Sequence, residues 1–148
     1  MTARATPPAT ETVTCPGCGR RNRVPVAAHG TPRCGSCHAP LPWLVSATDD
    51  DFTEVAERSR VPVLVDLWAA WCGPCRVVAP GVERVALELA GRVKAVKVDV
   101  DRAPGVAARF DARSIPTLLV LRDGRVVARQ VGALSEQAMV DWVRRAVD

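Results

Sequence analysis

The sequence contains no tyrosine and only two phenylalanines, and aromatic residues make up 4% of its 148 positions. It also lacks any run of about 18 apolar residues, so neither a transmembrane helix nor a membrane partner is expected. The opening stretch MTARATPPATETVT has no apolar segment of the kind found in secretory signal peptides. We therefore expect a cytoplasmic protein in a reducing compartment, where structural disulfides are rare.

The composition is that of a globular protein, with 48% hydrophobic and 24% charged residues. Its length suits one ordinary domain with a small appendage, and a monomer is expected. The net charge of +4 lies entirely on residues 1–47, which hold five arginines and one acid. The same segment holds Cys15, Cys18, Cys34 and Cys37, and four thiolates around one Zn²⁺ would offset its charge by about −2. We therefore interpret the basic segment as a solvated face and do not expect nucleic acid as a partner.

The sequence changes character near residue 43. Residues 1–13 are polar and include adjacent prolines, which predicts a disordered tail. Residues 14–42 hold four of the six cysteines and few large apolar side chains, so they need a cross-link such as a bound metal ion in order to fold. From residue 43 to 148, strand-like and helix-like segments alternate, which predicts one α/β domain.

The alternation in residues 43–148 predicts a partly parallel sheet with an antiparallel hairpin on one side and helices on both faces. The continuous apolar run 61–68 is typical of a buried central strand. Asp123-Gly124 between two β-rich runs indicates the hairpin. In order, we expect a short helix opened by 49–51, a strand at 61–68, a helix at 74–90, a strand at 93–98, a short helix at 103–110, hairpin strands at 117–121 and 126–131, and a helix from Ser135 to about 147.

The Trp71-Cys72-Gly73-Pro74-Cys75 motif falls where the central strand meets the long helix. Free backbone N–H groups and the helix dipole at that point favour a Cys72 thiolate, the species that attacks disulfides. Cys75, one turn further on, is expected to be more shielded and to resolve the mixed disulfide. The alternative, half of a zinc site, lacks a second Cys or His pair in this domain.

Residues 45–148 resemble the thioredoxin family through this motif and further positions. The resemblance implies the thioredoxin fold, with a buried Asp66 that exchanges a proton with Cys75 and a Lys97 that neighbours that carboxylate. It also implies a cis-proline loop at Ile115-Pro116, whose backbone pairs with the substrate. The remaining substrate-binding residues implied by the resemblance are Trp71, Gly73, Pro74, Gly132 and Ala133. Asp66 as a satisfied core residue, Trp71 as ordinary core and Gly132 as an ordinary turn stay open as alternatives.

The resemblance implies a protein-disulfide reductase that is itself reduced by thioredoxin reductase and NADPH. The chain has no flavin or nicotinamide motif, so we expect it to bind neither cofactor. An oxidase or isomerase on the same fold is an alternative that the Gly73-Pro74 dipeptide disfavours. A redox-inert binding protein is another alternative, and the intact cysteine pair with Asp66 argues against it.

The pairs Cys15/Cys18 and Cys34/Cys37 are separated by 15 residues, the spacing of a four-cysteine zinc site. A rubredoxin-type iron site and two disulfides remain as alternatives. Two such pairs before a thioredoxin-like domain resemble the thioredoxin-2 type, with a zinc-ribbon-like, oxidation-sensitive module. We hypothesise that oxidation ejects zinc, loosens the module and changes access to Cys72.

Overall fold

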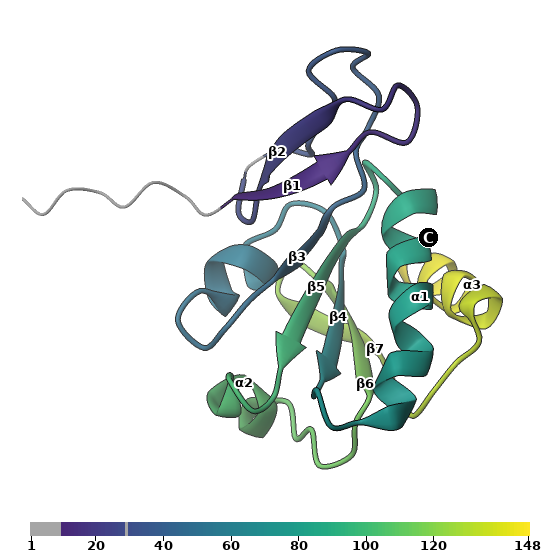
Figure 1. Ribbon diagram of the computed structural model, residues 1–148. Helices are drawn as coiled ribbons and strands as arrows, with labels where there is room; N and C mark the ends of the chain where they lie inside the picture. The colour runs from purple at the N-terminus through teal and green to yellow at the C-terminus, as the bar shows by residue number, and fades with distance from the viewer. Residues whose placement is uncertain (1–9, 29) are drawn as a thin grey trace, which may run out of the picture.

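The computed structural model describes residues 10–28 and 30–148 (Figure 1). At its centre is a five-stranded sheet in the order β3-β5-β4-β6-β7. Strands β3, β5 and β4 run parallel to one another. Strand β6 is antiparallel to both of its neighbours, β4 and β7. Their bounds are β3 Leu44–Ser46, β5 Lys94–Asp99, β4 Val63–Trp68, β6 Thr117–Arg122 and β7 Arg125–Val131. The expected mixed sheet with an antiparallel hairpin at one side is confirmed.

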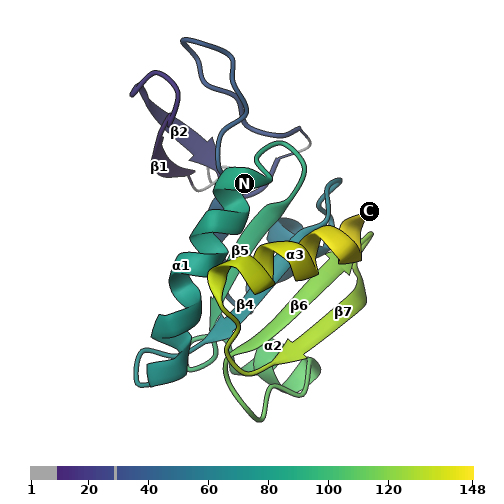
Figure 2. The ribbon, with the colours of Figure 1, turned by 90° about the vertical axis from the view of Figure 1, so that its right-hand side faces the viewer.

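Helices α1 (Gly73–Glu88) and α3 (Glu136–Val147) cover one face of the sheet, where Figure 2 shows α3 lying across it beside α1. The apolar stripe of α1 packs there with buried side chains of α3 such as Met139. A Cβ atom at Gly81 would lie 2.9 Å from Met139 Cε, so a glycine permits this close approach of the two helices. Among the described residues, no helix is both long and apolar enough to cross a bilayer.

The other face of the sheet is covered by the π-helical segment η1 (Thr53–Glu57) and the short helix α2 (Pro104–Arg109). Phe52 and Phe110, which flank these segments, meet edge to face with ring centroids 5.5 Å apart. Helices therefore cover both faces, as expected from the sequence. The hairpin turn uses Asp123 and Gly124 at positive φ angles of 52° and 76°, as its Asp-Gly sequence predicts.

Strand β3 was not among the expected elements. It has only three residues, too few for an alternation of apolar and polar side chains to be recognised. Its place at the edge of the sheet comes from parallel pairing with β5, which is a tertiary contact.

The cysteine-rich segment contains a two-stranded antiparallel sheet, β1 (Thr10–Thr14) with β2 (Arg21–Pro25). The prediction of a disordered tail over residues 1–13 was wrong for residues 10–13, because β1 pairs with β2 through its whole length. The Thr-Glu-Thr-Val-Thr sequence of β1 alternates exposed and half-buried side chains, as a strand does. Because Val13 is its one apolar residue, this alternation cannot be recognised from hydrophobicity in the sequence. The rest of that predicted tail, residues 1–9, lies outside the described residues.

The cysteine-rich module lies at the end of the sheet where the parallel strands begin, and α1 begins at the opposite end (Figure 1). Lys94, the first residue of β5, donates its backbone N–H to Pro62, and Ala95 donates to Trp43 at the same end. Val24 and Val26 of the module belong to one buried cluster with core residues of the α/β domain. The module is therefore continuous with the domain core.

Candidate active site and metal centre

Cys72 and Cys75 form a disulfide at the start of α1, with their Cα atoms 5.3 Å apart. Cys72 is the N-cap of the helix, and its Sγ accepts a hydrogen bond from the backbone N–H of Cys75 at 3.2 Å. Pro74 occupies the first turn, where its missing N–H leaves no helix bond unmade. The reduced Cys72 sulfur would sit among free helix N–H groups, an arrangement that favours a thiolate.

The expectation that Cys75 is more shielded than Cys72 was wrong for this oxidised state, because each residue is 4% exposed. Both pack in a small cluster with Ala69 against the side chain of Ile115. Loop contacts therefore cover Cys72 as effectively as the helix covers Cys75.

The Ile115–Pro116 peptide bond is cis, and the loop that contains it lies beside the disulfide. Cys72 Sγ is 3.8 Å from the carbonyl oxygen of Ile115. Gly132 donates its N–H to the carbonyl of Pro116 at 2.9 Å, which brings Gly132 and the exposed Ala133 to the same loop cluster. The predicted substrate-binding residues from the two loops are thus brought together next to Cys72.

Trp71 is 69% exposed, so it is not an ordinary core residue. Its Nε1 donates a hydrogen bond to Asp101 Oδ2 at 2.9 Å, which orients the ring beside the disulfide. Gly73 and Pro74 are also exposed. The sequence reasoning missed Asp101, and its only signal was a position in the acidic stretch that follows β5.

Asp66 lies in the middle of β4 and is 1% exposed. Neither of its carboxylate oxygens is hydrogen-bonded by a described residue, so it is not a satisfied core polar group. Burial raises the pKa of Asp66 to about 6, while the charge of Lys97 acts to lower it. An open cavity of about 120 Å³ is lined by Asp66, Cys75 and Lys97, among other residues. A buried carboxyl with a pKa near neutrality next to a cysteine can exchange a proton with it.

Lys97 is paired with Asp66 across the parallel strands β4 and β5. Its side chain is half-buried, and its Nζ lies 4.9 Å from the centroid of the Trp68 ring. None of the ion pairs between described residues includes Lys97. The ammonium therefore acts on Asp66 through its electric field and leaves the carboxylate without a direct partner.

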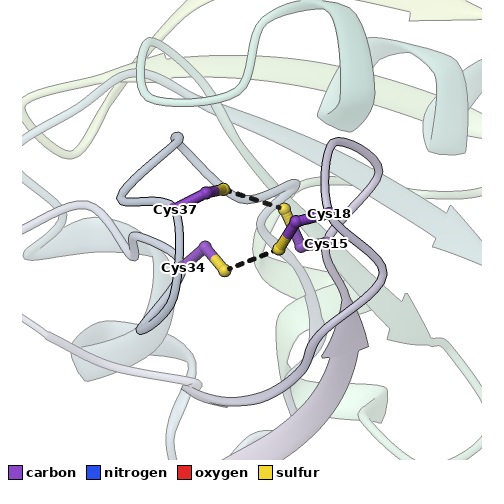
Figure 3. A group of neighbouring side chains, drawn as sticks. All are labelled: Cys15, Cys18, Cys34 and Cys37. Carbon is purple, nitrogen blue, oxygen red and sulfur yellow. Dashed lines mark hydrogen bonds between the residues drawn. The ribbon is translucent and has the colours of Figure 1, made fainter.

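The four cysteines of the module point toward one another from two facing loops (Figure 3). Cys15 Sγ lies 3.6 Å from Cys37 Sγ, Cys18 Sγ lies 3.5 Å from Cys34 Sγ, and all four sulfurs lie within 4.8 Å of one another. A tetrahedral zinc with Zn–S bonds of about 2.3 Å separates its sulfurs by roughly 3.8 Å. These distances fit a metal site and exceed the S–S length of about 2.05 Å in a disulfide, so the four cysteines are not joined as two disulfides in this structure.

Electrostatics in the module favour thiolates at the two buried cysteines. Backbone N–H groups of Cys37 and Ser36 are the main cause that lowers the pKa of Cys34 to about 6. Those of Cys18 and Gly17 likewise lower the pKa of Cys15. Thiolates are the form in which cysteine binds zinc, so these two cysteines suit a bound metal ion. The backbone of Arg20 acts to lower the pKa of Cys18, but hydrogen bonding with Cys34, burial and the other two sulfurs raise it to about 11.

Comparison with known proteins agrees with this geometry. Residues 43–145 match the family model described as Thioredoxin. A "Thioredoxin" from Haemophilus influenzae is 46% identical over 99 residues, which cover 67% of this chain and 92% of that protein. A "Thioredoxin" from Allochromatium vinosum is 47% identical over 100 residues, which cover 68% of this chain and 94% of that protein.

A "Thioredoxin C-3" from Corynebacterium nephridii is 40% identical over 136 residues, which cover 88% of this chain and 92% of that protein. This share exceeds what residues 43–148 alone provide, so the alignment extends into the cysteine-rich module. The matched family, the mixed sheet and the Cys-x-x-Cys disulfide at the start of α1 agree with one another. This chain belongs to the thioredoxin family and is a protein-disulfide oxidoreductase.

Proposed function

We propose that this chain reduces disulfide bonds in protein substrates through Cys72 and Cys75, and that thioredoxin reductase and NADPH restore its dithiol. The observation that carries the proposal is a disulfide at a helix N-terminus with a buried, unpartnered Asp66 next to the cavity beside Cys75. The chain itself is proposed to bind neither flavin nor nicotinamide. We further propose that it works as a cytoplasmic monomer.

The first step is attack of the Cys72 thiolate on a substrate disulfide. A Cys72–substrate disulfide forms, the substrate S–S bond breaks, and one substrate sulfur leaves as a thiolate. The carbonyl of Ile115, close to Cys72 Sγ, is placed to pair with an extended substrate backbone. The proposed docking surface consists of Trp71, Gly73, Pro74, Ile115, Pro116, Gly132 and Ala133.

The second step releases the substrate. The Asp66 carboxylate takes the proton of the Cys75 thiol, and the Cys75 thiolate attacks Cys72 Sγ. The Cys72–substrate bond breaks, and the second substrate sulfur leaves as a thiolate. Two electrons have then passed from the Cys72/Cys75 dithiol to the substrate. Lys97 holds Asp66 partly ionised, because its positive charge favours the carboxylate.

The proposed reaction is tested by reduction of insulin with NADPH and thioredoxin reductase. We expect wild-type turnover, complete loss of turnover in Cys72→Ser, and a trapped mixed disulfide in Cys75→Ser. Turnover by Cys72→Ser, or no turnover by the wild type with a reductase active on another thioredoxin, would contradict the proposal. Cys18→Ser, which leaves the Cys72/Cys75 pair intact, serves as a matched control for the loss of one cysteine.

For the N-terminal part we propose a thioredoxin-2 type module, residues 14–42, ahead of a thioredoxin domain, residues 43–148. Cys15, Cys18, Cys34 and Cys37 would hold Zn²⁺, which supplies a fixed crosslink between the two loops. The sulfur separations support this ligand set. A tetrathiolate iron centre has nearly the same geometry, so metal analysis of the purified protein identifies the ion.

We propose that the module senses oxidation by releasing zinc. The hypothesis that this changes access to Cys72 stays open, but the module and the start of α1, where Cys72 is the N-cap, lie at opposite ends of the sheet (Figure 1), so any effect on access would be indirect. Loss of zinc would loosen the part of the core that the module shares with the domain. The stability of the enzyme is then the first quantity that we expect oxidation to change.

A peroxide titration tests the sensing role with zinc release, thermal unfolding and insulin reduction recorded on one sample. After re-reduction of the Cys72/Cys75 pair, we expect the melting temperature to fall in proportion to the zinc released. An unchanged melting temperature after complete zinc loss would contradict the role. Loss of activity at an unchanged melting temperature would instead support control of access.

A further inference from the structure

Lys94, the first residue of β5, is 1% exposed. Its Nζ donates hydrogen bonds to the carbonyl of Val55 at 2.6 Å and to the carbonyl of Val26. The same atom lies 4.1 Å from the centroid of the Trp43 ring. None of the ion pairs between described residues includes Lys94. A buried ammonium without a carboxylate partner costs desolvation, which its bonds to the two carbonyls offset in part.

The partners of Lys94 come from two separate parts of the chain. Val55 belongs to η1, whereas Val26 directly follows strand β2 of the module. Trp43 makes a second link to the same segment, because its Nε1 donates to the carbonyl of Pro25 at 2.9 Å. Two buried side chains that touch each other thus bind the consecutive carbonyls of Pro25 and Val26. Neither of these side chains takes part in the proposed disulfide exchange.

The segment bound in this way is connected to the metal site. Strand β2 pairs with β1 as far as Thr14, the residue before Cys15. Cys15 and Cys34 are each 1% exposed and belong to the same buried cluster as Val26 and Trp43. Pro25 pairs with Thr10 at one end of the hairpin and Arg21 with Thr14 at the other, so a hold on Pro25 and Val26 would act on Cys15 through the length of β2 and through the shared buried cluster. A ligand set that is held in place before the metal binds retains it more tightly.

We propose that Lys94 and Trp43 are positioning residues that anchor the module to the thioredoxin domain and thereby set how tightly the four-cysteine site retains its metal. The metal half of this proposal rests on the proposed zinc occupancy. The anchoring half rests on the contacts of Lys94 and Trp43 alone.

Limited trypsin digestion at pH 9 tests the anchoring in the full-length protein. The variants are Lys94→Met, which keeps the length of the side chain, and Trp43→Phe, which keeps a ring without the Nε1 donor. Burial lowers the pKa of Lys94 to about 8, so at pH 9 its neutral amine makes both hydrogen bonds, and the methionine variant removes them without relieving a buried charge. The module offers trypsin the exposed residues Arg20, Arg21, Arg23 and Arg33.

We expect cleavage within the module to be roughly tenfold faster in each variant, because the loss of a buried hydrogen-bond donor makes local opening of the module easier. Insulin reduction at the wild-type rate by both variants shows that the domain is folded, since Lys94 begins β5 and Trp43 bonds to Ala95 at the end of the sheet opposite to the start of α1 (Figure 1). Cleavage within twofold of the wild-type rate in both variants would overturn the anchoring.

Zinc transfer to a coloured chelator tests the metal half. The matched control is Lys97→Met, which also removes a lysine of β5 that lies over a tryptophan ring, here that of Trp68 on β4. The strand partners of Lys97 are Ser46 and Asp66, which lie outside residues 14–42. We expect about tenfold faster transfer from Lys94→Met and Trp43→Phe, and the wild-type rate from Lys97→Met. Equal rates in all four proteins overturn metal control by these residues. A wild type without zinc also overturns that half, and the trypsin rates then decide the anchoring.

Discussion

Asp66 and Lys97 lie across from each other on the parallel strands β4 and β5, and both line the cavity that reaches Cys75. The two side chains form no ion pair, so the buried carboxyl has only the field of the ammonium to favour its charged form. Its pKa of about 6 expresses the balance between burial, the larger effect, and that field. This balance can be measured separately in stability and in activity.

Asp66→Asn is expected to stabilise the oxidised protein at neutral pH. The pKa of Asp66 is raised from 3.8 to about 6 on folding, so its contribution is complete below pH 4 and is lost as pH rises through 6. At pH 7 the buried carboxylate costs about 2–3 kcal/mol, which the neutral amide avoids. Urea unfolding at pH 5 and pH 8 measures this difference. Equal gains in the free energy of unfolding at both pH values would show that ionisation of Asp66 is not the cause.

Lys97→Met is expected to move the pH profile of disulfide reduction toward higher pH. Removal of the ammonium leaves burial unopposed, so the pKa of Asp66 rises above 6 and less carboxylate is present at pH 7. We expect a several-fold slower release of substrate at pH 7 and near-normal rates at pH 9. Single-turnover kinetics between pH 5 and pH 9 would detect the shift. A uniform loss of rate at every pH would point to a structural role for Lys97.

Lys94 is expected to make stability rise with pH in the alkaline range. Its pKa falls from 10.5 to about 8 on folding, so the unfolded chain holds the proton between these values and folding strengthens as pH increases. The wild type should gain about 2 kcal/mol relative to Lys94→Met between pH 8 and pH 10. If the free energy of unfolding changed with pH by the same amount in both proteins over this range, the assignment of the rise to Lys94 would be contradicted.

The other charged groups around Lys94 do not account for such a rise. Asp51 acts in the opposite direction, since its charge raises the pKa of Lys94. The remaining charged side chains on η1 and β2 are either paired or exposed: Glu54 with Arg58, Glu57 with Arg109, and the solvent-facing Arg21 and Arg23.

Trp71→Ala is expected to weaken substrate binding with little effect on folding. The ring is 69% exposed, so its loss changes the free energy of unfolding by less than about 1 kcal/mol. An exposed aromatic next to the disulfide contributes to substrate contact, and its removal should raise KM for insulin about tenfold. Asp101→Asn is the companion variant, because it keeps the ring and weakens only the bond that orients it. A KM unchanged in Trp71→Ala would remove Trp71 from the docking surface.

The elements that sequence predicted well are those with strong local signals. The long apolar run of β4, the Asp-Gly turn before β7 and the Ser135 cap of α3 all carry their information within a few residues. The burial of Asp66 was foreseen for the same reason, since a single acid within an apolar strand is carried into the core with its neighbours. The clustering of the four cysteines of the module was predicted from their spacing.

The elements that were missed depend on distant partners. Strands β1, β2 and β3 were all missed. β1 and β2 form by pairing with each other and β3 by pairing with β5, and nothing in their own short sequences requires it. Asp101 was missed because its role comes from Trp71, 30 residues earlier. The equal burial of Cys72 and Cys75 depends on the Ile115 loop, which lies far along the chain.

The continuity of the module with the domain core affects how the chain can be divided. A protein shortened to residues 43–148 would keep every residue assigned to disulfide exchange. It would also open to solvent the apolar side chains that Val24 and Val26 now cover, and leave Lys94 without one of its two acceptors. Such a fragment should be prone to self-association through this newly bared patch. The natural limit of the folding unit therefore lies upstream of the residue at which the family match begins.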